Sequence, residues 1–186
     1  YMSQNYSLHL CGGYVRDMCK GEPSFLDFIP DYLMGNFARI QLNLSCYMHL
    51  INNDRLVRTL LMPELQGRQF ILQFAEPDFK LLSEIREAGI DAVPLFDCSG
   101  GRGKTPEEWP KAPSDLYCGY AGGLTPENVE AELKRIAAVA GSNNVWIDVE
   151  TGVRSDRNEF DWKRVFSFLD ACKPWVDTDA LKPIGF

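Results

Sequence analysis

Short apolar segments alternate with segments of helical periodicity six times along this chain. Each apolar segment is bounded by polar residues or glycine, as expected for a buried strand. A repeat of strand and helix over about 30 residues is the signature of a parallel sheet with crossover helices. We therefore predict an α/β protein, with strands at residues 7–11, 38–45, 69–75, 92–98, 116–121 and 144–149.

The helices are expected between these strands, where apolar residues recur at helical spacing. In residues 78–88, for example, four apolar residues share one face, and Gly89 follows as a suitable helix end. Residues 99–115 are the exception, because three glycines and three prolines leave room for little more than a turn. No linker composition divides the chain, so one domain is expected over residues 1–186. The predicted helices cover residues 24–33, 54–65, 78–88, 126–140 and 160–172.

Composition narrows the class of protein. The 186 residues are 45% hydrophobic and 24% charged, which suits a folded globular chain rather than a disordered one. A net charge of −7 without runs of Lys or Arg argues against a nucleic acid or an anionic membrane as partner. No stretch approaches the roughly 20 apolar residues of a membrane span. Six cysteines without a CxxC pair favour buried thiols, so a reducing, cytoplasmic location is expected.

Polar residues stand at the ends of the predicted strands, where strands buried on both faces would carry Val, Ile or Leu. Paired residues are two apart, so both side chains of a pair lie on one face of their strand. If that face points into a barrel, the strands deliver a ring of polar groups to its mouth, where barrel enzymes keep their chemistry. Each residue alone is equally well explained as a hydrogen-bonded core residue or a helix cap. The ring consists of His9, Cys11, Gln41, Asn43, Gln73, Asp97, Asp148 and Glu150.

Three ring residues are candidates for catalysis. Asp97 follows an apolar run and precedes a glycine-rich loop, a partly buried position that would suit an acid or base. His9 is another candidate, although a single histidine on a strand is more often structural. Cys11 is the third, but no positive charge near it in the sequence would activate its thiol. The remaining ring residues are candidates for binding the substrate.

Two glycine turns follow the last two predicted strands. In the first, Thr125 suits a helix N-cap and Pro126 the first helical position, so Gly122 and Gly123 lie where a strand passes into a helix. Gly152 lies in the corresponding place after the last strand. Backbone N–H groups at a helix N-terminus favour anions. The two turns therefore predict a site for a small phosphorylated ligand.

Several runs together resemble the phosphoribosylanthranilate isomerase family, whose members are (β/α)8 barrels of tryptophan biosynthesis. LFDCSGGRGK at 95–104 is similar to the family's sixth strand and glycine loop, AGGLTPENV at 121–129 to its seventh unit, IDVETGV at 147–153 to its eighth, and RIQLN at 39–43 to its fourth strand. The resemblance implies that Asp97 is the general acid of a ring-opening isomerisation. It also implies that backbone amides of Gly101, Gly103, Gly122, Gly123 and Gly152 bind a substrate phosphate.

The chain departs from the family pattern at residues that would carry out the reaction, and it looks more like an uncharacterised bacterial branch with HLCG and YAGGL runs. The family base is a cysteine in the first strand, whereas the HLCG run here, at residues 9–12, falls in the third strand. The general base is therefore not assigned. Arg102 stands in place of a threonine and Arg154 in place of a glutamate. Because guanidinium groups bind planar anions bidentately, both arginines are candidate ligands of phosphate or a carboxylate, or else surface charges.

Six strand–helix units cannot close an eight-stranded barrel, because two strand edges would stay unpaired. We expect a TIM-type barrel of the phosphate-binding kind, with strands three to eight present and two N-terminal units, on the order of 50 residues, outside this chain. A partner chain that completes the barrel and a doubly wound six-stranded sheet are the alternatives. Sequential strand order with unpaired outer strands would favour the barrel over the doubly wound sheet.

Two functions fit these observations. The first is an isomerase or lyase that acts on a phosphorylated sugar or ribosyl compound by acid–base catalysis, without a cofactor. The second is a non-catalytic phosphate-binding or scaffold barrel, because a fold does not decide function. A metal-dependent mechanism has less support, since His9, Asp148 and Glu150 lack the spacing of known metal sites.

Overall fold

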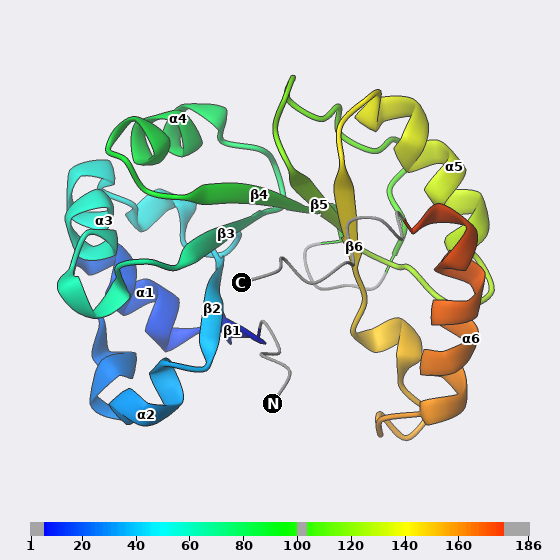
Figure 1. The fold of residues 1–186 in the computed structure, drawn as a ribbon, viewed down its shortest axis with the longest axis horizontal. Coiled ribbons are helices and arrows are strands. Elements are labelled where there is room, and N and C mark those ends of the chain that lie inside the picture. Colours follow the sequence, from blue (N-terminus) through cyan, green and yellow to red (C-terminus); the bar gives the residue numbers. More distant parts are fainter. Residues whose placement is uncertain (1–5, 100–103, 177–186) are drawn as a thin grey trace, which may run out of the picture.

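The computed structural model describes residues 6–99 and 104–176. Six parallel strands form one sheet in sequential order (Figure 1). Within the described residues, the first and last strands each pair on one side only. The expected arc of parallel strands is confirmed, and the doubly wound alternative is wrong because it requires a reversal of strand order. The strands are β1 Tyr6–Leu10, β2 Phe37–Asn43, β3 Gln69–Phe74, β4 Ala92–Asp97, β5 Cys118–Ala121 and β6 Val145–Asp148.

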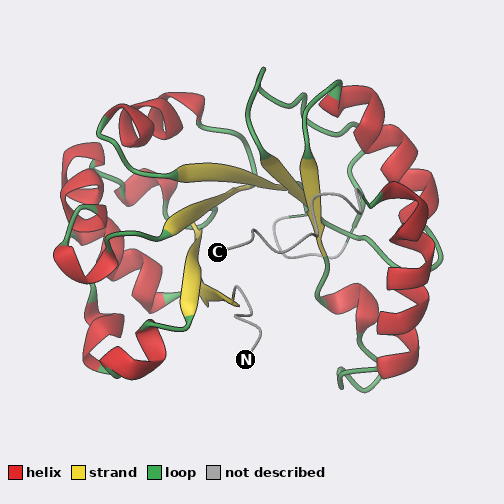
Figure 2. Ribbon diagram, in the orientation of Figure 1, coloured by secondary structure: helices red, strands yellow, loops and turns green. Residues whose placement is uncertain are grey.

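The sheet curls into an open half-barrel whose helices cover the convex side (Figure 2). This layering, with helices outside and a concave inner face, is that of a (β/α) barrel and confirms the expected fold class. The α-helices are α1 Gly13–Lys20, α2 Asp31–Met34, α3 Asn53–Leu60, α4 Phe79–Glu87, α5 Val129–Ala140 and α6 Trp162–Cys172. Short 3-10 helices are η1 Ser24–Asp27, η2 Met48–Leu50, η3 Pro63–Leu65, η4 Thr151–Val153 and η5 Lys173–Trp175.

The first βα unit differs from the prediction. Helix α1 follows β1 directly and buries Val15, Met18 and Cys19 against the sheet, although no helix was expected there. The helix expected at residues 24–33 is wrong, because Pro30 interrupts it and leaves η1 and the short α2. The helix that connects β1 to β2 therefore begins at Gly13. Glycine has a low helix propensity, so the sequence does not indicate a helix start at this residue.

Alternate residues of each strand point to opposite sides of the curled sheet. On the helix side, Ile40, Leu42 and Tyr120 are fully buried. On the inner side, Ile71, Val93, Leu95 and Ala121 form a small apolar cluster, against which Trp146 packs. The indole of Trp146 also covers Gly119, where a Cβ atom would collide with it. The inner face is therefore filled by side chains before the strands reach their carboxyl ends.

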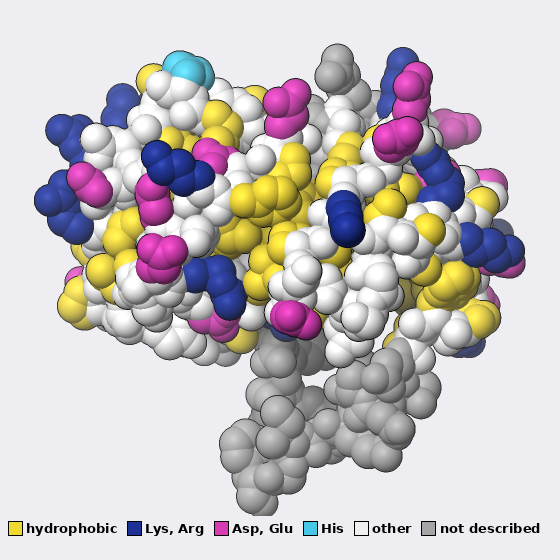
Figure 3. All heavy atoms as spheres, turned by 90° about the horizontal axis from the view of Figure 1, so that it is seen from above, with side chains coloured by type: hydrophobic (Ala, Val, Ile, Leu, Met, Phe, Trp, Pro, Cys, Tyr) yellow, Lys and Arg dark blue, Asp and Glu magenta, His cyan; other side chains and the backbone are white. Residues whose placement is uncertain are grey.

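The connection from β4 to β5 contains no helix in residues 104–115. Where a crossover helix would lie, Phe79, Leu82, Pro113 and Leu116 line an apolar groove. Seen from above, hydrophobic side chains gather in the middle of this face of the molecule (Figure 3). The glycine-rich and proline-rich composition of the connection thus produces a loop, and its described part packs along α5, where Trp109 bonds to Glu132 and the Ala112 N–H donates to the Val139 carbonyl.

Candidate functional site

Side-chain hydrogen bonds join the carboxyl ends of β2, β3 and β4 on the inner face. Gln41 Nε2 donates to Gln73 Oε1 at 2.8 Å, and Gln73 Nε2 donates to Asp97 Oδ2 at 2.7 Å. Asp97 Oδ1 accepts from the hydroxyl of Ser99 at 2.7 Å and from its main-chain N–H at 3.2 Å. Gln41, Gln73 and Asp97 are all buried. Both oxygens of Asp97 therefore have donors, which hold the carboxylate in one orientation.

Asp97 and Asp148 lie at the same level of the sheet. The strand ladder pairs Asp97 with Ala121, and Ala121 with Asp148. Their backbones are thus two strands apart, about 9.5 Å. Because Ala121 between them carries only a methyl group, both carboxylates face the same open space.

Burial raises the pKa of the Asp148 carboxyl above its usual range. The carboxylates of Asp97 and Glu150 raise this pKa further, whereas the imidazole of His9 opposes the shift. The shift means that Asp148 holds its proton at a higher pH than a solvated aspartate does. Titratable groups with such shifts are common at active sites, although structural carboxylates also show them.

The strand ends open into a cavity of about 320 Å³. It brings together residues that lie far apart in the sequence, because five of the six strands, or the residues that follow them, contribute to its lining. Its lining includes His9, Gln73, Asp97, Ser99, Gly122, Gly123, Asp148, Glu150, Gly152 and Arg164.

The glycine turn after β5 packs closely against the loop that follows β4. Gly123 has φ +66°, and a Cβ atom there would collide with the backbone of Lys104 and Thr105. Gly122 has φ +121°, and its Cβ would lie 3.0 Å from the main-chain nitrogen of Ser99. Both the backbone conformation and the close approach therefore require glycine at these positions.

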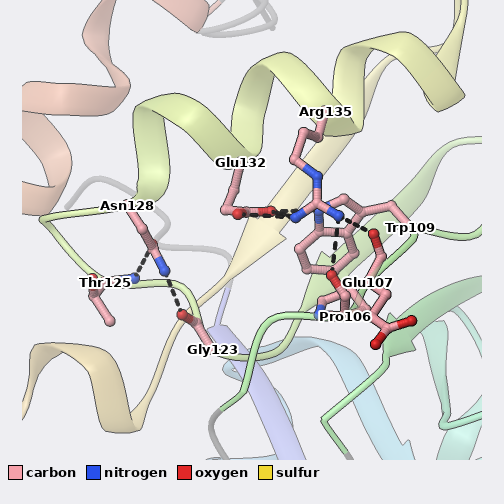
Figure 4. A network of polar contacts seen from close by, with 8 residues as sticks. All are labelled: Pro106, Glu107, Trp109, Gly123, Thr125, Asn128, Glu132 and Arg135. Atoms are coloured by element: carbon pink, nitrogen blue, oxygen red, sulfur yellow. Dashed lines mark hydrogen bonds and ion pairs between the residues drawn. The ribbon is translucent and has the colours of Figure 1, made fainter.

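The turn continues into a capped helical end (Figure 4). The side chain of Asn128 accepts from the Thr125 N–H at 2.8 Å, and the Thr125 hydroxyl accepts from the Glu127 N–H at 3.2 Å. Asn128 Nδ2 also donates to the Gly123 carbonyl at 2.9 Å. These bonds cap the turn that precedes α5, although the regular helix begins only at Val129.

A second network ties the body of α5 to the loop between β4 and β5 (Figure 4). The buried carboxylate of Glu132 accepts from Trp109 Nε1 at 2.8 Å and from Arg135 Nη1 at 2.8 Å. Arg135 Nη2 donates to the carbonyls of Pro106, at 3.0 Å, and Glu107. Helix α5 therefore holds both the glycine turn at its start and the neighbouring loop that packs on this turn.

Of the two arginines predicted as anion ligands or surface charges, the structure describes Arg154. Arg154 pairs with Glu150 at 3.0 Å and does not line the cavity in the described part of the chain. Arg164, in the first turn of α6, lines the cavity instead, and its Nε donates to the Gly152 carbonyl at 3.0 Å. Arg164 was not predicted as a site residue, because helical spacing indicates a helix but does not show which loop a helix terminus contacts.

Two further predicted site residues, Cys11 and Asn43, are described by the structure and do not line the cavity. Cys11 is exposed between β1 and α1. The side chain of Asn43 accepts from the Ser45 N–H at 3.3 Å, a local turn contact. Gly101, Arg102 and Gly103 lie outside the described residues. For these five residues the proposed roles stay predictions.

The described residues contain neither a metal-binding cluster nor a membrane-spanning helix. No three His, Cys, Asp or Glu side chains of residues 6–99 and 104–176 are grouped so that they could hold a metal ion. In the same part of the chain, no helix has the length and apolar character that crossing a bilayer requires.

The curled parallel sheet and the cavity at its carboxyl ends place the protein in the class of (β/α) barrels. A family model described as N-(5'phosphoribosyl)anthranilate (PRA) isomerase matches residues 60–171, and the chain belongs to this family. The family resemblance noted in the sequence is therefore confirmed.

Two solved structures are similar to this chain. One is phosphoribosyl anthranilate isomerase from Thermotoga maritima, with 14% identity, a TM-score of 0.36, and coverage of 90% of this chain and 98% of that one. The other is a cube-shaped protein cage designed by fusing symmetric oligomeric domains, with 15% identity, a TM-score of 0.41, and coverage of 95% of this chain and 74% of that one. No curated protein matches the chain.

Proposed function

We propose that this protein is an isomerase of a phosphorylated ribosyl compound that works by acid–base catalysis. The observation that carries the proposal is that Asp97 and Asp148 flank Ala121 in the same cavity that Gly122, Gly123 and Gly152 line. An isomerisation of this kind needs one group that takes a proton from carbon and one that gives a proton to oxygen, and substrate and product contain the same atoms. Membership of the PRA isomerase family supports the same reaction class.

Binding would be divided between the two sides of the cavity. The phosphate is placed at the glycine turns, where backbone N–H groups and the start of α5 favour an anion. The ribosyl part then extends toward the strand ends, within reach of Gln73, Asp97 and Asp148. Gln41 supports this site indirectly, because it orients Gln73.

The contacts favour a specific division of roles between the two aspartates. The oxygens of Asp97 accept hydrogen bonds from the amide of Gln73 and the backbone of Ser99, which suits a carboxylate that receives a proton. The raised pKa of Asp148 suits a carboxyl group that donates one. This division reverses the acid role that the family resemblance implies for Asp97, and it supplies the base that the sequence left unassigned.

Two measurements test the proposal. Inorganic phosphate and ribose 5-phosphate are titrated while the backbone amide resonances of Gly122 and Gly123 are followed by NMR, and shifts of these resonances are expected. Turnover of N-(5'-phosphoribosyl)anthranilate is then compared in the protein, in Asp97→Asn and in Asp91→Asn. Loss of a proton-transfer group should lower kcat about 100-fold or more. Asp91 precedes β4 and bonds to Gln69, so its variant is the matched control.

The same experiments distinguish catalysis from a second function, binding of a phosphorylated ligand without turnover. Both oxygens of Asp97 accept hydrogen bonds from within the protein, from Gln73 and Ser99, as those of a structural carboxylate do. This observation favours a phosphate-binding or scaffold barrel without catalysis. If Asp97→Asn binds ribose 5-phosphate and no turnover occurs in the unaltered protein, the non-catalytic function holds. If no anion binds at the glycine turns, both functions are refuted.

A further inference from the structure

The cavity has an unfavourable charge for a phosphorylated ligand. Asp97, Asp148 and Glu150 line it, and Arg164 is the sole Lys or Arg side chain among the described lining residues. A phosphate monoester carries up to two negative charges near neutral pH. Backbone N–H groups supply only partial positive charge, and they would act against three nearby carboxylates. A bound phosphate therefore needs a full positive charge on its side of the cavity.

Arg164 is held in place by two loops at once. Its Nε donates to the Gly152 carbonyl at 3.0 Å, in the loop after β6. Its Nη1 and Nη2 donate to the two carboxylate oxygens of Glu127, each at 3.0 Å, in the turn after β5. The guanidinium plane is thus oriented by both glycine turns that are proposed to bind phosphate.

The guanidinium keeps donors for a ligand in this arrangement. A guanidinium group has five N–H donors. Within the described residues, Gly152 and Glu127 use three of them, which leaves two, one on each Nη. The Arg164 side chain is 32% exposed, and that of Glu127 is 65% exposed. The ion pair is therefore accessible to solvent, and its contribution to folding is small.

From this geometry we propose that Arg164 is the cationic phosphate ligand of the cavity and that Glu127 is the residue that positions it. The inference rests on the proposed phosphate site and deepens it. It assigns to Arg164 the role that the sequence analysis gave to Arg154. The ligand class is a phosphate monoester whose remaining part extends toward Asp97 and Asp148.

Four variants test this assignment. Arg164→Met removes the charge, Arg164→Lys keeps it without the planar fork, Glu127→Gln keeps the arginine but weakens its orientation, and Lys173→Met, which breaks an exposed ion pair with Asp170 at the end of the same helix, is the matched control. Affinities for inorganic phosphate and ribose 5-phosphate are measured by calorimetry. Arg164→Met should lower both affinities about 10- to 100-fold, since charge-assisted hydrogen bonds are lost. Arg164→Lys should recover part of this loss, Glu127→Gln should weaken binding a few-fold, and Lys173→Met should leave it unchanged.

Further measurements separate a binding role from a structural one. The melting temperature of Arg164→Met should stay close to that of the unaltered protein, because the ion pair is exposed. In Arg164→Ala, added guanidinium ion at millimolar concentration should restore part of the phosphate affinity, which a misfolded loop would not allow. If the unaltered protein binds phosphate and Arg164→Met binds it equally well, the assignment is wrong. If the unaltered protein binds none, the proposed phosphate site itself fails.

Discussion

The contact between the last two βα units is tested most directly at Gly152. A Cβ atom there would lie 2.9 Å from the carbonyl carbon of Leu124 and closer still to its oxygen. Leu124 is 2% exposed, so its backbone cannot move without disturbing the core. Gly152→Ala therefore forces overpacking, which costs about 1–3 kcal/mol. In a protein of this size each kcal/mol lowers the melting temperature by about 2–4 °C, so a decrease of about 2–12 °C is expected.

Gly13→Ala is the matched control for this measurement. Neither glycine has a positive φ, so alanine strains neither backbone. At Gly13 the added methyl group meets only the flexible end of Arg16, 3.7 Å away. Replacement of glycine by alanine lowers the conformational entropy of the unfolded chain, and at Gly13 this effect should stabilise the protein by about 0.4–1 kcal/mol. Thermal unfolding followed by circular dichroism compares the two. Equal changes in melting temperature would refute the argument, because the close contact would then have no effect.

Three further predictions concern side chains. Asp148→Asn should stabilise the protein at pH 7 and have no effect near pH 3. The pKa of Asp148 is raised in the folded protein, so ionisation of this carboxyl costs folding stability once the pH rises above the pKa of the unfolded state. Denaturant unfolding at both pH values measures the effect, and destabilisation at pH 7 would contradict it. Trp109→Phe should lower the free energy of unfolding by about 1.5–3 kcal/mol, because the carboxylate of Glu132 loses a hydrogen bond from the indole. Urea unfolding measures this, and an unchanged midpoint would contradict it. In the native protein a thiol reagent should label the exposed Cys11 and Cys46 before Cys19, because burial protects Cys19 and raises its pKa to about 11. Equal labelling rates for the three thiols would contradict this.

The strands were predictable because their signal is local. A short apolar run such as residues 92–97 predicts a buried strand, and repeated alternation of such runs with helical segments indicates parallel pairing. Helix α1 was missed for the opposite reason. Gly12 and Gly13 at its start disfavour a helix locally, and the burial of Val15 and Met18 against the sheet overrides that preference.

The candidate site was predictable only in part. The alternation along each strand indicated that Gln73, Asp97 and Asp148 share the inner face, since side chains two residues apart point the same way. The choice between Arg154 and Arg164 was not available from the sequence. Both follow the last strand, and only the packing of α6 against the turn after β5 brings one of them to Glu127.

By itself the sequence determined the alternation of strand and helix, the polar strand ends and the glycine turns, because each is set by residues close together along the chain. The tertiary structure alone decided which of these groups meet. The register between strands β4, β5 and β6 places Asp97, Ala121 and Asp148 at one level, and α5 joins the glycine turn to the loop between β4 and β5. Hydrogen-bonding partners between distant segments depend on that packing, and no local pattern in a single chain records them.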